Sequence, residues 1–316
     1  MTFQDLLGKL NSYWASQGCS IIQPYDLEVG ASTLHPMTAL KVLGPEPWSI
    51  ANVQPSRRPT DGRYTRNPMR SQRYFQYQVI IKPSPENVVD MYMDSLRALG
   101  LDLNKHDVRL VEDDWENPSL GAAGVGWEVW LDGTEVSQFT FFQQMGGIEL
   151  NPVCAELTYG PERLCLALNK EFSFWQDLKW DNHRSYFEME WQSEMQNNVY
   201  NFEVASVGLL KELFDKLEAE SERVLNTKVY WDTDNKIMTA EENENTTEEM
   251  PSGHGPLALV QPAYDLALKC SHIFNIMDAR GAVGTAQRAV YINRIRTRVR
   301  ACCLKYMEQY KTVSAK

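Results

Sequence analysis

Two segments far apart in the chain carry the residue types that a phosphate-rich ligand requires. The first segment is basic and holds, within seventeen residues, Arg57, Arg58, Arg63, Arg66, Arg70 and Arg73. The second segment, residues 156–164, turns at Gly160-Pro161 and places Arg163 directly after the turn. Planar guanidinium groups match phosphate oxygens better than the point charge of lysine does. Together the two segments indicate a site for a nucleoside triphosphate.

The elements that must position these side chains follow from local patterns. Residues 73–82 alternate as a strand does, with Phe75, Tyr77, Val79 and Ile81 on one face and Gln76, Gln78 and Ile80 on the other. Pro161 near the first helical position predicts a helix with Arg163 on its first turn. An adenine ring stacks on flat groups, and Phe75 and Arg163 are the candidates for its two faces. The alternative is a solvated basic hairpin followed by an ordinary helix start.

The rest of the pattern indicates one antiparallel sheet with helices around it. Residues 3–17 and 85–99 have helical periodicity, and Ser84 is a plausible N-cap for the second helix. Strand-like runs at 108–111, 127–131, 135–144 and 153–159 are joined by short connections, which favours antiparallel pairing. The glycine-rich stretch 121–126 does not have the spacing of a dinucleotide-binding loop. We interpret it as a flexible loop near the site.

We expect the chain to divide into one domain at residues 1–180, which carries both arginine segments and would be the catalytic domain, and a mainly helical region at 181–316. Residues 236–255 are acidic and almost free of apolar side chains, which predicts a flexible insertion. The C-terminal helical pattern is rich in basic residues, namely Arg288, Arg294, Arg296, Arg298, Arg300, Lys305 and Lys311. This basic series is either a charged outer face or a docking surface for a partner.

Composition limits the classes of protein. The 316 residues are 43% hydrophobic, and no apolar run approaches the ~20 residues of a membrane span. No export signal begins the chain, and the six cysteines show neither a Cys-x-x-Cys pair nor metal-ligand spacing, so we expect a cytoplasmic protein with reduced thiols. The net charge of -11 is opposite in sign to the positive charge expected of a protein that binds RNA by itself.

The two arginine segments resemble motifs 2 and 3 of the class II aminoacyl-tRNA synthetases. Residues 14–26, 30–36, 53–64 and 112–118 resemble in sequence the alpha subunits of bacterial glycyl-tRNA synthetases. The resemblance covers about residues 3–232 and 257–300. The chain departs from that family at Thr65-Arg66, where relatives usually carry a glycine and an acidic residue.

This resemblance implies an α+β fold, with a class II synthetase-type antiparallel sheet flanked by helices and a C-terminal helical domain. It also implies activation of glycine by ATP with Mg²⁺, an alpha homodimer, and a beta subunit that provides most contacts to tRNA(Gly).

The resemblance also assigns roles to residues. Arg58 would contact the α-phosphate and the glycine carboxylate, and Arg63 and Arg163 would engage the outer phosphates and adenine, with Arg58 and Arg163 as the catalytic pair. Further ATP-binding candidates are Asp61, Arg73, Phe75 and Glu162. The glycine pocket would use Glu156 for the ammonium group, supplemented by Gln76, Gln78 and Thr158, with Thr33 and Trp115 as its wall. Glu135 is a candidate Mg²⁺ ligand.

Two other functions fit the same residues. One is a stand-alone relative that forms the adenylate of another small acid without tRNA. The other is a non-catalytic paralogue that only binds nucleotide or a partner. Such paralogues usually lose the phosphate-binding arginines, whereas Arg58 and Arg163 are both present.

Overall fold

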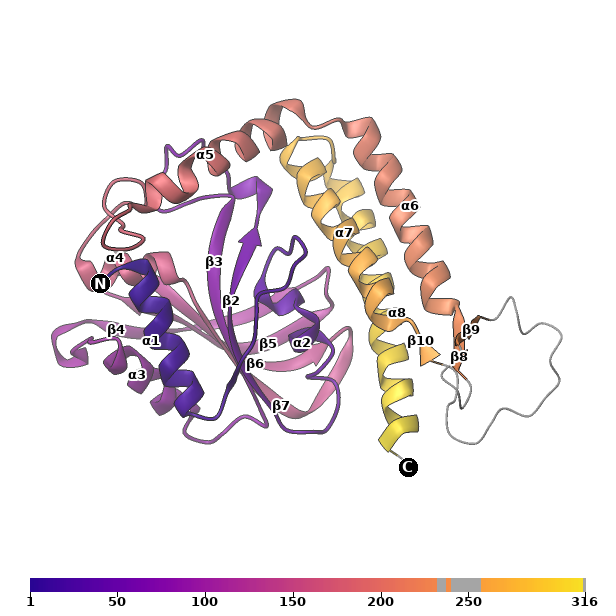
Figure 1. The fold of residues 1–316 in the computed structure, drawn as a ribbon, viewed down its shortest axis with the longest axis horizontal. Helices are drawn as coiled ribbons and strands as arrows, with labels where there is room; N and C mark the ends of the chain where they lie inside the picture. Colours follow the sequence, from indigo (N-terminus) through magenta and orange to yellow (C-terminus); the bar gives the residue numbers. More distant parts are fainter. Residues whose placement is uncertain (232–236, 240–256, 315–316) are drawn as a thin grey trace.

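A large mixed sheet forms the centre of the computed structural model, which describes residues 1–231, 237–239 and 257–314 (Figure 1). Its seven strands follow the order β1-β2-β3-β7-β6-β5-β4. The strands are β1 (Ser20–Ile21), β2 (Trp48–Arg57), β3 (Arg73–Lys82), β4 (Val108–Asn117), β5 (Ala122–Leu131), β6 (Thr134–Met145) and β7 (Ile148–Tyr159). All neighbours pair antiparallel except β1 and β2, which are parallel. The predicted α+β fold with an antiparallel sheet and flanking helices is confirmed, with the short β1 making the sheet mixed.

Helices α1 (Phe3–Ser16), α3 (Val88–Ala98) and α4 (Pro161–Asn169) cover one face of the sheet. Phe75, Tyr77 and Val79, which are odd-numbered residues of β3, are buried with them. A capping box of Thr2 and Asp5 starts α1 where the sequence predicts it. The start of α3 differs from the prediction: the Ser84 amide bonds to the Val153 carbonyl, so Ser84 belongs to the sheet margin and the helix begins at Val88.

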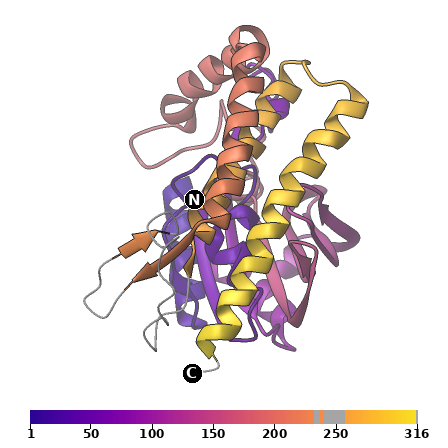
Figure 2. The same ribbon diagram turned by 90° about the vertical axis from the view of Figure 1, so that its right-hand side faces the viewer.

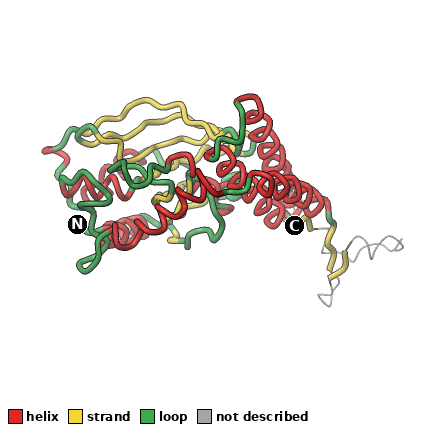
Figure 3. Tube along the Cα trace, turned by 90° about the horizontal axis from the view of Figure 1, so that it is seen from above, coloured by secondary structure: helices red, strands yellow, loops and turns green. Residues whose placement is uncertain are grey.

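Long helices from the C-terminal half cover the opposite face. They are α6 (Val207–Asn226), α7 (Val260–Ala279) and α8 (Thr285–Ser314), and they share a core with Ile50 of β2 and Ile80 of β3. Figures 1 and 2 show α7 and α8 side by side along the sheet, and Figure 3 shows the C-terminal helices grouped at one end of the molecule. Apolar side chains on both faces therefore explain why the sheet is closed in by helices.

The remaining elements are short or connect the two layers. Helix α5 (Tyr186–Val199) continues into a π-helical turn, η4 (Tyr200–Val204). Short helical segments are η1 (Ser32–Leu34), α2 (Pro36–Ala39), η2 (Pro59–Asp61) and η3 (Leu103–Lys105), and a small sheet contains β8 (Lys228–Trp231), β9 (Ile237–Thr239) and β10 (Leu257–Ala258). The acidic insertion predicted at 236–255 lies outside the described residues except for β9.

The arginines of α8 bind groups of this same chain. Arg294 pairs with Glu218 and Asp215 of α6, and its guanidinium lies 4.5 Å from the centre of the Phe214 ring. The others bind acidic side chains or loop carbonyls: Arg288 with Asp278, Arg298 with Glu222, Arg296 with the Pro118 carbonyl and Arg300 with the Gly147 carbonyl. These contacts attach α8 to α6, to α7 and to two hairpins of the sheet.

The glycine-rich stretch 121–126 is not a loop, which corrects the expectation from sequence. It begins strand β5, and its glycines allow β6 to approach closely. A Cβ on Gly124 would lie 2.5 Å from the Phe141 carbonyl oxygen, and a Cβ on Gly126 would overlap the Phe139 carbonyl. The sequence pattern is therefore a requirement of strand packing and not of ligand binding.

Gly126→Ala is expected to lower the free energy of unfolding by about 3 kcal/mol or more, because the added methyl would have to displace the backbone of β6. Urea unfolding followed by circular dichroism measures this change. Gly208→Ala is the matched control, since a Cβ there meets no atom within 4 Å. An unfolding midpoint for Gly126→Ala equal to that of Gly208→Ala would contradict the packing explanation.

Candidate active site

A hollow of about 400 Å³ lies where the ends of β2, β3, β6 and β7 meet the start of α4. Its walls contain residues from both arginine segments, among them Arg58, Asp61, Arg70, Tyr74, Gln76, Glu135, Ser137, Gln138, Thr158, Glu162 and Arg163. The segments meet because β3 pairs directly with β7, with Gln78 opposite Thr158. The sequence prediction that the two segments share one site is consistent with this register.

Three arginines reach the hollow, two from the connection between β2 and β3 and one from α4. The Arg58 Nε atom donates to the Gly30 carbonyl at 3.0 Å, and the guanidinium lies 5.1 Å from the centre of the Tyr74 ring. Arg70 lies 3.7 Å from an Asp61 carboxylate oxygen. Arg163, on the first turn of α4, donates to Glu135 at 3.0 Å. Cations in this arrangement can bind the phosphates of a nucleotide at more than one point.

A buried carboxylate lies beside the hollow, two residues before Thr158 on strand β7. Glu156 of β7 is 2% exposed and accepts hydrogen bonds from the Thr33 hydroxyl at 3.0 Å and from the Gln78 amide. The Thr38 hydroxyl in turn donates to the Gln78 oxygen at 2.9 Å, which fixes the orientation of that amide. Burial raises the pKa of Glu156 to about 7, although the bonds from Gln78 and Thr33 act in the opposite direction.

Glu156 has no cationic partner among the residues that the structure describes. Several polar atoms around it also lack partners within that part of the chain: Ser32 Oγ, Thr140 Oγ1 and both amide atoms of Asn52. The register places Asn52 opposite Gln78 and Thr140 opposite Glu156. Since buried polar groups are nearly always hydrogen-bonded, this cluster is suited to a small polar ligand that carries a positive charge.

The structure places the other predicted glycine-site residues as follows. The Gln76 oxygen accepts the Ser32 amide at 2.8 Å, and both Gln76 and Thr158 line the hollow. Trp115 lies on the edge strand β4, where its ring packs on Phe142 with centroids 5.1 Å apart. It is not among the residues that line the hollow, so a role as the wall of a glycine pocket stays a prediction.

Phe75 is on the wrong face of β3 for the predicted adenine contact. Its ring is buried against Phe3 and Trp180 at centroid distances of 5.3 and 5.9 Å, in the core under α1. Strand alternation turns its neighbour Tyr74 toward the hollow. The β3 aromatic ring that lines the hollow is therefore that of Tyr74, which was not among the residues predicted from the sequence.

Two of the predicted ATP-binding arginines point elsewhere in this structure. Arg73 forms an ion pair of 2.5 Å with Glu190 of α5. Arg63 donates to the carbonyls of Thr60 and Gly62 at 2.9 and 2.6 Å, and it lines a separate hollow beside Phe202. Neither residue is part of the hollow that contains Arg58 and Arg163. Arg70, which was not among the predicted ATP-binding residues, lines that hollow together with Arg58 and Arg163.

Two acidic side chains of the hollow differ in accessibility. Glu162 is buried, accepts the Phe75 amide at 2.8 Å and the Tyr186 hydroxyl at 2.9 Å, and has its pKa raised to about 7 by that burial. These bonds hold α4 to β3 and to α5. Glu135 is more open, though paired with Arg163. Among the described residues no group of three metal-ligating side chains occurs. Mg²⁺ commonly uses only one or two carboxylates together with substrate phosphates, and Glu135 fits that limited role.

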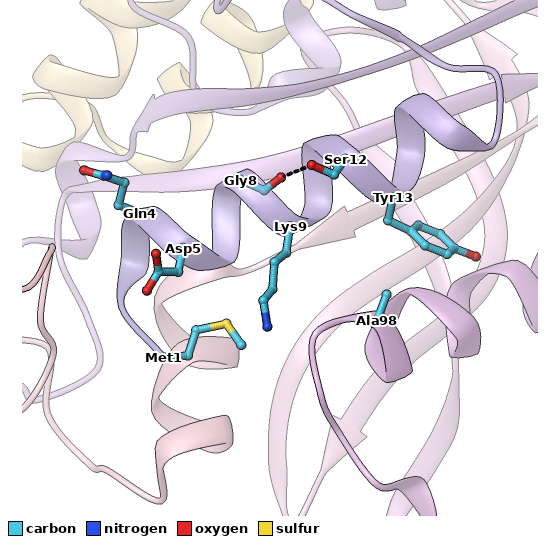
Figure 4. Close-up of a pocket in the computed structure, with 8 residues that line it drawn as sticks. All are labelled: Met1, Gln4, Asp5, Gly8, Lys9, Ser12, Tyr13 and Ala98. Atoms are coloured by element: carbon cyan, nitrogen blue, oxygen red, sulfur yellow. Dashed lines mark hydrogen bonds between the residues drawn. The ribbon is translucent and has the colours of Figure 1, made fainter.

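A larger hollow, of about 790 Å³, lies between α1 and α3 on the far face of the sheet. Figure 4 shows its lining, in which Lys9 is the one basic side chain and Asp5 the one acidic one. It lacks an arginine and a carboxylate cluster, so it does not have the chemistry of a nucleotide site.

Comparison with known proteins gives the family. Residues 3–311 match the family model described as glycyl-tRNA synthetase alpha subunit. The chain belongs to this family. Family membership makes it an aminoacyl-tRNA synthetase chain, and the resemblance inferred from residues 53–64 and 156–164 is confirmed over nearly the whole length. Among solved structures, the pyrrolysyl tRNA synthetase PylSc of Desulfitobacterium hafniense is similar, with a TM-score of 0.39 and 14% sequence identity over 58% of this chain and 74% of that chain.

None of the helices that the structure describes is both long and apolar enough to span a membrane.

Proposed function

We propose that this chain activates glycine with ATP to form glycyl-adenylate and, together with a beta subunit, transfers the glycyl group to tRNA(Gly). The observation that carries this proposal is the position of the uncompensated Glu156 carboxylate beside a hollow lined by Arg58, Arg70 and Arg163. A ligand that is cationic at one end and joined to phosphates at the other matches both parts. An aminoacyl-adenylate is such a ligand.

The chemistry requires positioning and charge neutralisation. A carboxylate oxygen of glycine attacks the α-phosphorus of ATP, the bond to the β-phosphate oxygen breaks, and pyrophosphate leaves with the electron pair. Arg58 is placed to bind the α-phosphate and the glycine carboxylate, while Arg163 and Arg70 bind the outer phosphates. Tyr74 supplies a ring for adenine. Preorganised cations of this type lower the barrier without a protein nucleophile.

Mg²⁺, when bound, would neutralise charge on the phosphates, and Glu135 is the described carboxylate best placed to hold it.

Selection of glycine follows from the size of the buried cluster. The ammonium group would pair with Glu156 and donate hydrogen bonds to neighbouring hydroxyl oxygens, including those of Thr33 and Thr158. A side-chain methyl, as in alanine, would press on packed atoms of η1 and the sheet. Overpacking of one methyl costs about 1 to 3 kcal/mol, which corresponds to roughly a 10- to 200-fold preference.

A separate chain is needed for most contacts to RNA. The net charge of -11 is unsuited to holding polyphosphate over a large surface. We therefore assign most contacts to tRNA(Gly) to the beta subunit, and we expect two copies of this chain in the complete enzyme.

The direct test is exchange of pyrophosphate into ATP with glycine, alanine or serine, by the chain alone and after addition of the beta subunit. Glycine-dependent exchange is expected to exceed alanine-dependent exchange by at least about tenfold in kcat/KM. Exchange with a different small acid would favour the stand-alone relative. Nucleotide binding without exchange in either mixture would favour the non-catalytic paralogue and reject the proposal.

A further inference from the structure

The segment that carries Thr33 has little structure of its own. Between β1 and β2 the chain contains only η1, with three residues, and α2, with four residues. Such short elements are not stable in isolation, because most helical stability comes from packing. Yet Thr33 is 3% exposed and holds a defined bond of 3.0 Å to Glu156. Something outside the segment must therefore fix its conformation.

Helix α7 makes the contacts that can do this. The fully buried Tyr264 donates its hydroxyl to the Leu34 carbonyl at 2.9 Å, at the C-terminal end of η1. The Tyr25 hydroxyl bonds to the carboxylate of Asp265, at the other end of the segment. Three turns along α7, the Asn275 amide nitrogen lies 3.7 Å from where a Cβ on Gly30 would be. Residues 264, 268, 271 or 272, and 275 lie on one stripe of a helix, and Asp265 lies at the margin of that stripe, so α7 contacts the segment at several points along its length.

These contacts connect to the binding residues through adjacent backbone. Leu34 follows Thr33 directly, and the Ser32 amide donates to Gln76 in the hollow at 2.8 Å. Gly30 offers its carbonyl both to Arg58 at 3.0 Å and to the Tyr74 hydroxyl at 3.2 Å. A shift of residues 25–35 would therefore move the Thr33 hydroxyl away from Glu156 and loosen Arg58 at the same time.

We propose that α7 is a positioning element of the amino-acid site, and that Tyr264 is the positioning residue that holds Thr33 against Glu156. Tyr264 touches neither Glu156 nor the arginine-lined hollow in the contacts of the structure, so it acts through Leu34. A residue 230 positions along the chain from its bonding partner thus completes the site. The catalytic domain could not then be separated from the helical region without loss of amino-acid binding. The choice of glycine as ligand rests on the proposed function, whereas the positioning of residues 25–35 does not.

The test compares Tyr264→Phe with Tyr13→Phe. Both changes delete one hydroxyl that donates to a backbone carbonyl of another element, since the Tyr13 hydroxyl bonds to Met91 on α3 at 2.7 Å, on the other face of the sheet. Pyrophosphate exchange by the wild-type chain with its beta subunit gives KM for glycine and for ATP. Tyr264→Phe is expected to raise KM for glycine about tenfold and KM for ATP by a smaller factor, because the lost hydrogen bond lies beside Thr33, whereas the Gly30 carbonyl that holds Arg58 is four residues from Leu34.

Hydrogen exchange gives a second measurement that needs no ligand. Amides of residues 25–39 are expected to exchange faster in Tyr264→Phe than in the wild type, and to be unchanged in Tyr13→Phe. If Tyr264→Phe fails to fold, Asp265→Asn weakens the bond to Tyr25 and is measured in the same two ways.

The outcomes separate the two proposals. A wild-type enzyme without glycine-dependent exchange would reject the proposed function, and hydrogen exchange would still decide whether α7 holds the segment. Equal behaviour of Tyr264→Phe and Tyr13→Phe in both measurements would overturn the positioning role. Faster amide exchange with an unchanged KM for glycine in an active enzyme would overturn it as well, because the segment would then move without consequence for the site.

Discussion

Replacing Glu156 with glutamine is expected to lower kcat/KM for glycine in pyrophosphate exchange by at least about a hundredfold. The substitution keeps the shape of the side chain and removes the negative charge that would pair with the ammonium group. Loss of one partner of a buried charge pair commonly costs about 3 to 5 kcal/mol. The KM for ATP should change little, because Glu156 is not among the residues that line the arginine hollow.

The same substitution is expected to stabilise the ligand-free chain at neutral and higher pH. Burial raises the pKa of Glu156 from the usual 4.5 to about 7 in the folded chain. The unfolded chain therefore releases its proton first, and the folded state becomes less favourable as the pH rises from about 4.5 to about 7. The full difference above that range is on the order of 3 kcal/mol. Glutamine does not ionise and removes this penalty.

Thermal unfolding at pH 5 and pH 8 measures the effect. Glu156→Gln should raise the melting temperature more at pH 8 than at pH 5. Glu116 lies on the exposed part of β4, and Glu116→Gln should leave the melting temperature unchanged at both pH values. Glycine binding should restore the charge balance and release a proton near pH 7. A variant with reduced stability at pH 8 and unchanged use of glycine would show that Glu156 has a structural role only.

The structure also shows which parts of the site were predictable from sequence. The position of Arg163 follows from Gly160-Pro161, because that dipeptide ends a strand and starts a helix locally. The common face of Gln76 and Gln78 follows from strand alternation. Alternation also excludes Phe75 from that face and places Tyr74 on it, so the side of β3 on which each aromatic ring lies is predictable from the sequence.

Other parts of the site depend on register, which sequence patterns do not contain. Asn52 borders the buried cluster only because β2 pairs with β3 so that Asn52 faces Gln78. The pairing of Arg73 with Glu190 joins a strand to a helix more than a hundred residues away. Glycines such as those of 121–126 are found both in flexible loops and in closely packed strands. Here the close approach of the neighbouring strand β6 shows that they serve packing. The contacts of α7 with residues 25–35 have the same origin in long-range packing.

Arg58→Ala is expected to reduce adenylate formation by about a thousandfold, which is the typical effect of removing one preorganised group that binds charge in the transition state. Arg58 connects the hollow with the Glu156 cluster, because its Nε atom bonds to Gly30 in the segment that also carries Thr33. It is therefore placed to bind the phosphorus that is attacked and the carboxylate that attacks. Single-turnover formation of the adenylate measures the loss directly.

Arg58→Lys separates charge from geometry. Lysine keeps the positive charge but cannot form two parallel bonds to phosphate, nor stack on Tyr74 as the guanidinium does at 5.1 Å. We expect it to recover at most about a tenth of wild-type activity. Arg109→Ala is the control, because this exposed arginine pairs with Asp107 at the far edge of the sheet. If Arg58→Ala folds normally and retains activity within tenfold of Arg109→Ala, the phosphate-binding role must belong to Arg70 or Arg163, the other two arginines of the hollow.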